Sequence, residues 1–219
     1  LDQAKLKGVY FAGDHTISGG IEYETLDIFN LFLPRSQGLY VFNPTTVGGQ
    51  VVSSGIQNFA NRTATSLSYG NAFTNNANDG AAAFGYDVLG FFLQDQWRIT
   101  PDFELQYGLR YETFSSSDKP QFNQRFFDRY GFSNQETLDG RDLLMPRLGF
   151  NWAIADQTVV RGGVGLFGGG TPNVWISNSY SNDGVTVVRS DYPSGAVPPA
   201  VVTAALTNVN GFDLPQAVL

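Results

Sequence analysis

The sequence contains no cysteine, one histidine and one methionine, and only 15% of its residues are charged. Without cysteine, the chain cannot form a disulfide scaffold, a thiolate zinc site or a thiol nucleophile. Its 13 lysines and arginines are outnumbered by 20 acidic residues, which gives a net charge of −7. Nucleic acids and anionic lipid surfaces bind mainly cationic proteins, so this balance argues against both as docking partners. No apolar run approaches the roughly 20 residues of a membrane-spanning helix.

Aromatic residues and glycines are abundant instead, with 18 Phe, 10 Tyr and 25 Gly. Aromatic side chains suit the pleated surface of a sheet, and glycines mark turns and bulges. The composition therefore favours an all-β fold. A transmembrane antiparallel β-barrel is compatible with it, because barrel strands alternate apolar and polar residues and produce no long apolar run.

The clearest pattern is an alternation that predicts a long hairpin over about 86–113. One face would carry Leu89, Phe91, Leu93, Trp97, Ile99, Phe103, Leu105, Tyr107, Leu109 and Tyr111. The other would carry Gly90, Gln94, Gln96, Arg98, Glu104, Gln106, Gly108, Arg110 and Glu112. A tight turn is expected at Thr100-Pro101-Asp102, where proline has no ladder donor to lose. The result is one apolar and one strongly polar face.

Two further hairpins are expected, over about 5–25 and 143–168. The first turns at Gly13-Asp14-His15, and the second turns around Ala155-Asp156. In the second, Leu144, Leu148, Phe150 and Trp152 share one face, opposite Arg147, Gly149 and Asn151. Glycines obscure which way the side chains of the returning strand, 158–168, face.

The connections between the hairpins are long, at about 26–85, 114–142 and 169–219. Compact soluble domains rarely contain such long connections. Short turns that alternate with long loops are typical of outer-membrane barrels, in which the long loops are extracellular. We therefore expect a single partial β-barrel domain over 1–219. A short helix is expected at residues 198–206 because this segment opens with prolines and continues with helix formers.

Four aromatic residues are candidates for membrane interfaces. Trp97 and Trp152 both lie a few residues before a short turn, and Tyr23 and Tyr111 lie near the opposite ends of their strands. Tryptophan and tyrosine gather at the two membrane interfaces, which predicts two girdles. The alternative is that they are core aromatics of a soluble sandwich. Asp95 shares the apolar face by parity, so we expect it either near the membrane edge or in a local bulge.

Candidate catalytic and metal sites have weak support. His15 stands alone in a turn and is expected to be solvated, because a triad needs an oriented nucleophile and acid. Asn76–Gly80 and Leu138–Asp142 offer oxygen ligands for Ca²⁺, but ordinary turns explain them better. Glu104 and Glu112 lie about 26 Å apart on one strand, too far to act together. We therefore expect no enzymatic activity, no resident metal and no cofactor.

Gly163-x-Gly165-x-x-Gly168 matches a dinucleotide-binding fingerprint, but that fingerprint requires a helix directly after it. Turn-forming residues follow instead, so we interpret these glycines as allowing curvature or close approach in a barrel strand. The loop 119–135 is a second candidate binding feature. Its aromatic and basic residues could contact a ligand or partner, or could simply pack on one another. The candidate residues are Phe122, Arg125, Phe126, Phe127, Arg129 and Tyr130.

Four stretches resemble the barrel strands of TonB-dependent outer-membrane transporters, and in particular the Oar-like group that carries a carboxypeptidase-regulatory-like domain. They are "GFFLQDQWRITPDFELQYGLRYE", "MPRLGFNW", "TVVRGGVGLF" and "HTISGGIEYE". The most specific parts are Gln94-Asp95-x-Trp97 and Gly108-Leu109-Arg110-Tyr111-Glu112. The resemblance covers about half of the chain and leaves the long loops out.

The resemblance implies the middle part of a barrel of about 22 strands, with the plug domain outside this chain. Such a transporter takes up a scarce substrate on energy from the TonB complex, which acts through the plug region. The expected partners are outer-membrane lipid, the TonB complex and a surface lipoprotein over the loops. The alternative is a secreted β-rich adhesin or carbohydrate-binding module, whose apolar faces would meet in a sandwich core.

Overall fold

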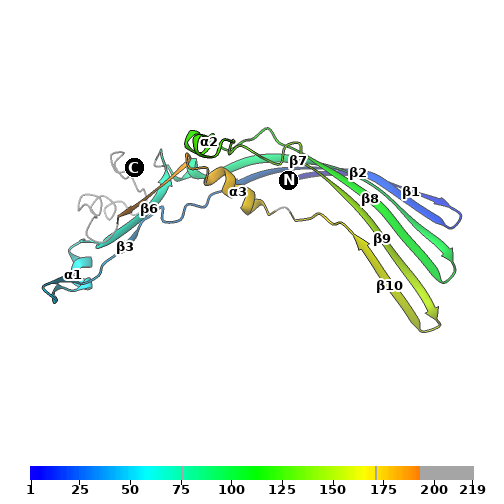
Figure 1. Cartoon of the computed structure of the whole chain (residues 1–219), viewed down its shortest axis with the longest axis horizontal. Helices are drawn as coiled ribbons and strands as arrows, with labels where there is room; N and C mark the ends of the chain where they lie inside the picture. The colour runs from blue at the N-terminus through cyan, green and yellow to red at the C-terminus, as the bar shows by residue number, and fades with distance from the viewer. Residues whose placement is uncertain (75, 171, 193–219) are drawn as a thin grey trace. The chain divides into compact units, whose positions relative to one another are not determined.

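A computed structural model describes residues 1–74, 76–170 and 172–192 of the chain. Its largest element is a six-stranded sheet with the strand order β1-β2-β7-β8-β9-β10 (Figure 1). The strands are β1 (Asp2–Ala12), β2 (His15–Asn30), β7 (Ala82–Thr100), β8 (Phe103–Ser115), β9 (Asp142–Ala155) and β10 (Thr158–Gly165). The pairings β1–β2, β7–β8, β8–β9 and β9–β10 are antiparallel.

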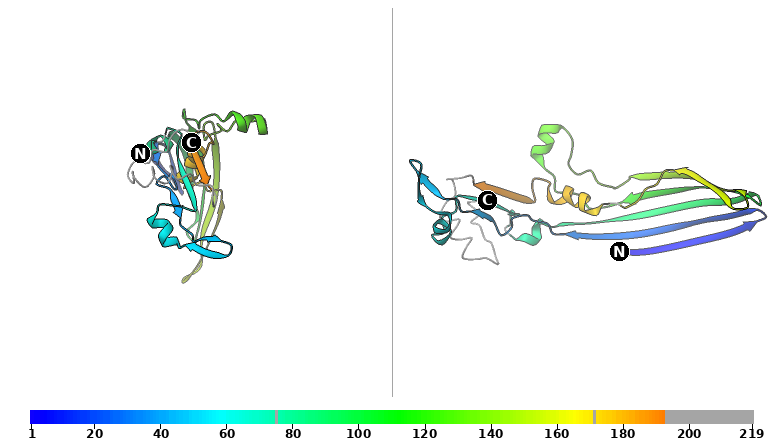
Figure 2. Two further views of the ribbon diagram at one scale, coloured as in Figure 1. Left: turned by 90° about the vertical axis from the view of Figure 1, so that its left-hand side faces the viewer. Right: turned by 90° about the horizontal axis from the view of Figure 1, so that it is seen from below.

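Three tight turns connect β1 to β2, β7 to β8 and β9 to β10 at one end of this sheet (Figure 2). Gly13 adopts φ +62° in the first turn, a left-handed conformation that favours glycine. Pro101 and Asp102 form the second turn, and Asp156 and Gln157 form the third. The first two hairpins extend a few residues beyond the spans expected from the alternation, whereas the third ends at Gly165, three residues before the expected end.

The register divides the sheet into two faces. The apolar face includes Ile17, Ile21, Leu93, Trp97, Leu105, Leu109, Phe150, Trp152, Val160 and Val164. The polar face includes Lys5, Glu22, Gln94, Glu104, Arg110, Glu112, Arg147, Asn151 and Arg161. The facing of the returning strand is therefore resolved, because Val160 pairs with Trp152 and Arg161 pairs with Asn151.

The chain forms two compact units. The sheet unit comprises residues 1–28, 84–119 and 136–172, and the loop unit comprises 29–83, 120–135 and the described residues after 172. The expected long loops therefore contain structure of their own. The loop unit has a three-stranded sheet of order β11-β6-β3, formed by Val187–Tyr192, Ser66–Ala72 and Leu39–Val41, and a small hairpin of β4 (Thr45–Val47) and β5 (Gln50–Ser53).

Four short helices complete the loop unit. They are α1 (Gly55–Ala60), the 3₁₀ helix η1 (Ala77–Gly80), α2 (Gln124–Tyr130) and α3 (Asn173–Ser181). Ser54 begins α1 with a capping box, in which its hydroxyl accepts the Gln57 N–H and the Gln57 side chain accepts the Ser54 N–H. The helix expected at residues 198–206 lies outside the described residues. None of the helices in the described ranges is long and apolar enough to cross a membrane.

The buried apolar side chains gather mainly in the loop unit. Leu67 and Tyr69 of β6 are almost fully buried, as are Ala72 and Ala82. In the sheet unit, by contrast, Leu93 is 61% exposed and Val164 is 72% exposed. The sheet unit therefore presents its apolar face outward rather than burying it against another layer.

Candidate functional site

An ion-pair network crosses the polar face from β1 to β8. Lys5 and Arg110 both contact the Glu22 carboxylate, and Arg110 Nε lies 2.6 Å from Glu112 Oε1. Gly90 makes room for this arrangement, because a Cβ there would lie 3.1 Å from the Arg110 guanidinium. A hollow of about 240 Å³ is lined in part by these residues. The sequence predicted a polar wall here, and the structure shows that these four charges compensate one another.

Polar residues also meet on the apolar face, around Asp95. The Asp95 carboxylate accepts hydrogen bonds from His15 Nδ1 at 2.6 Å and from the Tyr107 hydroxyl at 2.7 Å. The His15 ring stacks on Trp97 with 5.1 Å between ring centroids. The expectation that His15 is merely solvated is therefore wrong. No bulge occurs at Asp95, which pairs regularly with Tyr107, so partners rather than a backbone irregularity accommodate this carboxylate.

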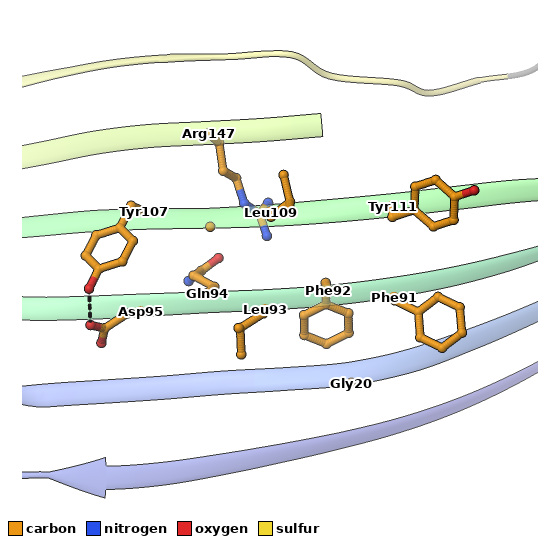
Figure 3. A pocket seen from close by; sticks show the side chains of 11 residues that line it. Gly20, Phe91, Phe92, Leu93, Gln94, Asp95, Tyr107, Leu109, Tyr111 and Arg147 are labelled. Atoms are coloured by element: carbon orange, nitrogen blue, oxygen red, sulfur yellow. Dashed lines mark hydrogen bonds between the residues drawn. The ribbon is translucent and has the colours of Figure 1, made fainter. Parts of the chain in front are cut away.

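A hollow of about 540 Å³ lies beside this cluster along β7 and β8 (Figure 3). Asp95 and Tyr107 stand at one end of it, and Phe91 and Tyr111 stand at the other. Most of its lining is apolar. The hollow has no array of charged groups, so it fits packing against other apolar groups better than catalysis.

The four girdle aromatics all lie on the apolar face. Trp97 pairs with Leu105 and Trp152 with Phe103, which sets both tryptophans close to the short turns. Tyr111 lies six residues beyond Leu105 on β8, or about 20 Å at the rise of a strand. That separation is comparable to the roughly 25 Å apolar band of outer-membrane barrels. Trp152 and Tyr23 are about half exposed, so they are not the core aromatics of a sandwich within the described residues.

The loop between β8 and β9 contains the second predicted binding feature. Asn123 begins α2 by accepting the Phe126 N–H, and Gly131 ends it in the left-handed conformation. Its aromatic rings contact one another in the pairs Phe122–Phe127, Phe126–Tyr130 and Phe126–Phe132. Arg129 lies over the Tyr130 ring at 5.5 Å. The structure thus brings these residues together by self-packing, while Arg125 and parts of the rings remain exposed.

The two acidic turns considered for Ca²⁺ make ordinary turn contacts. Asp79 accepts hydrogen bonds from Thr74 and Asn76, and Asp139 accepts the Ser116 N–H. Among the residues that the structure describes, no three His, Cys, Asp or Glu side chains are grouped so as to hold a metal ion.

The glycines of the fingerprint-like stretch serve strand packing. Gly163 and Gly165 lie in β10, and a Cβ on Gly163 would lie 2.9 Å from the Leu148 carbonyl oxygen of β9. The next helix, α3, begins at Asn173, well after Gly168. No helix N-terminus therefore follows the glycines directly, as a dinucleotide site requires.

Comparison with protein families agrees with this geometry. The model of the outer membrane beta barrel domain family matches residues 3–218, almost the whole chain. The chain matches no curated protein and no solved structure. The expected outer-membrane location is therefore confirmed, and the all-β, mostly antiparallel architecture fits it. This chain belongs to the outer-membrane β-barrel domain family.

Proposed function

We propose that the chain forms part of the barrel of a TonB-dependent outer-membrane transporter of the Oar-like kind, which takes up a scarce substrate. The family match supports a β-barrel domain in the outer membrane. The narrower assignment rests on the resemblance of the strand sequences, above all around Gln94–Trp97 and Gly108–Glu112. A secreted adhesin or carbohydrate-binding module does not fit an outer-membrane location.

The division of the six-stranded sheet into two unlike faces carries this proposal. The apolar face meets lipid, and the polar face with its Lys5–Glu22–Arg110–Glu112 network lines a hydrated interior. Within the described residues, β1 and β10 each pair on one side only. Open edges are avoided in membranes, so further strands complete the wall.

The remaining roles belong to the same proposal and rest on the resemblance of the strand sequences. Outer-membrane lipid contacts the apolar face, and the long loops face the exterior. Energy reaches the barrel from the TonB complex through the plug region, and a surface lipoprotein is a candidate partner of the loops. The candidate residues of the β8–β9 loop then contact substrate or partner, and the chain transports rather than catalyses.

Site-directed labelling of the full-length protein tests the topology. In a cysteine-free background, Arg125→Cys places a thiol in α2, and Asp102→Cys places one in a short turn. A membrane-impermeant thiol reagent is expected to label position 125 on intact cells, and position 102 only after the outer membrane is permeabilised. Equal labelling of both positions on intact cells contradicts the barrel orientation.

The link to TonB needs a separate measurement. Binding of the periplasmic domain of TonB to the purified full-length protein is expected, and the same domain should not bind a barrel protein that works without TonB. Absence of binding, with the labelling pattern intact, leaves an outer-membrane barrel but removes the transporter assignment.

A further inference from the structure

Arg147 of β9 lacks the kind of partner that three other cations of the polar face have. Lys5 and Arg110 contact carboxylates, and Arg161 donates to the Asn151 side chain at 3.2 Å. Within the described ranges, Arg147 has no carboxylate partner, and its buried Nε has no hydrogen-bond acceptor. A buried donor without an acceptor is destabilising, so this group calls for a partner from elsewhere.

Glycines surround Arg147 on the polar face. Its direct neighbours across the sheet are Gly108 on β8 and Gly165 on β10. Gly149 follows two residues later on its own strand, opposite Gly163. These residues have no side chains that could pair with the guanidinium. Figure 3 shows the Arg147 side chain reaching from β9 across β8 toward β7, where Gln94 lies.

A guanidinium presents a planar fork of donors that fits a carboxylate or a phosphate with two parallel hydrogen bonds. The charge of Arg147 and its unused donor therefore point to this class of ligand.

We infer that Arg147 is an anion-binding site on the interior wall, which takes the carboxylate or phosphate group of a ligand. The inference rests on the proposed function in placing this face in the barrel interior, and it assigns an anionic group to the transported substrate or to a segment that fills the barrel. Both sources present the same chemistry to Arg147, and they differ in whether the anion is free in solution or part of the protein.

Chemical modification distinguishes these sources. The full-length protein in detergent is treated with phenylglyoxal, which reacts with accessible guanidinium groups, and modification of each arginine is measured by peptide mass spectrometry. Inorganic phosphate is the probe anion, and Arg161 is the internal reference. If the site takes a free anion, millimolar phosphate is expected to slow modification of Arg147 by about tenfold, relative to Arg161.

If a carboxylate of the protein occupies the site, Arg147 is protected without phosphate and becomes reactive when the ionic strength is raised to about 1 M. Either pattern supports the inference. Modification of Arg147 at the rate of Arg161 under all conditions overturns it, as does a failure of Arg147 to react under any condition.

A variant pair provides a second readout that does not depend on transport. Where the modification pattern is that of a free anion, phosphate is expected to raise the melting temperature of the wild-type protein and of Arg161→Gln, but not of Arg147→Gln. Equal phosphate shifts in the two variants then contradict the site. Because cysteine labelling and TonB binding report on the proposed function independently, failure of one conclusion is distinguishable from failure of the other.

Discussion

The two units of this chain treat apolar side chains in opposite ways. In the loop unit, Leu67 and Tyr69 are enclosed by protein, as in an ordinary soluble core. In the sheet unit, Leu93, Leu109 and Val164 stand on an open face. Under the proposed function, the apolar side chains of the sheet unit face lipid, whereas the loop unit must bury its apolar side chains within the protein.

The largest expected effect is loss of the loop-unit core. Leu67→Ala removes a side chain that is only 2% exposed, and a cavity at such a site costs about 2–5 kcal/mol. Hydrogen exchange of the full-length protein in detergent should show faster exchange in β6 and β11, and unchanged exchange in β8 and β9. Ile56→Ala is the control, because Ile56 is 82% exposed. Equal effects of the two substitutions would mean that this core does not hold the loop unit.

A charged residue on the apolar face tests the sheet unit. Leu109→Arg places a cation on the apolar face between the two girdles, where insertion costs about 2–4 kcal/mol. We expect little folded protein in the outer membrane. Gln106→Arg, on the polar face of the same strand, should assemble normally. Urea titration of the membrane-inserted protein measures both, and equal stability of the two variants contradicts the assignment of the faces.

The Asp95 cluster places a carboxylate with partners on the apolar face. His15→Ala removes the donor to Asp95 and the ring that stacks on Trp97. Asp95 Oδ2 keeps the hydrogen bond from Tyr107, so the loss is that of one hydrogen bond to a charged group, about 1.5–3 kcal/mol. His15→Gln should recover part of this loss because glutamine restores a donor. Urea unfolding in lipid vesicles checks the order wild type, Gln, Ala; an alanine variant as stable as wild type would mean that the contact is dispensable.

The smallest effect concerns Tyr40 of β3. Burial, with a lesser contribution from Tyr69, raises the pKa of Tyr40 to about 12. The folded state therefore retains the proton when the unfolded chain loses it near pH 10, so stability falls as the pH rises from 10 to 12. The hydroxyl has no hydrogen-bond partner among the described residues. Tyr40→Phe should leave the melting temperature nearly unchanged at pH 7. Above pH 10, the melting temperature of this variant should fall less with pH than that of the wild type. If the melting temperatures of both proteins fall equally above pH 10, the loss of stability does not come from Tyr40.

Period-two alternation predicted most of the sheet unit. Leu93, Trp97 and Leu109 fall on the predicted face because the direction of a side chain in a strand depends only on local parity. The same rule left the returning strand undecided, since Gly162, Gly163 and Gly165 have no side chain to signal a face. There the register with β9 supplied the answer.

Local sequence patterns could not predict contacts between strands that are distant in the sequence. His15 and Asp95 are 80 residues apart, and nothing near His15 in the sequence indicates a partner. The isolation of Arg147 was equally hidden, because it depends on glycines from two neighbouring strands. The loop unit was missed because its strands are short and lack alternation, so the sequence there is typical of irregular loops.

The placement of β2 beside β7, with residues 31–81 between them, has a consequence for the order of assembly. The hairpins β1–β2, β7–β8 and β9–β10 each need only a tight turn, so they can form early from neighbouring residues. The seams between hairpins require long loops to close, although each doubling of loop length adds only about 0.6 kcal/mol. We therefore expect the wall to grow by addition of preformed hairpins, and the seam between β2 and β7 to be a late and rate-limiting joint.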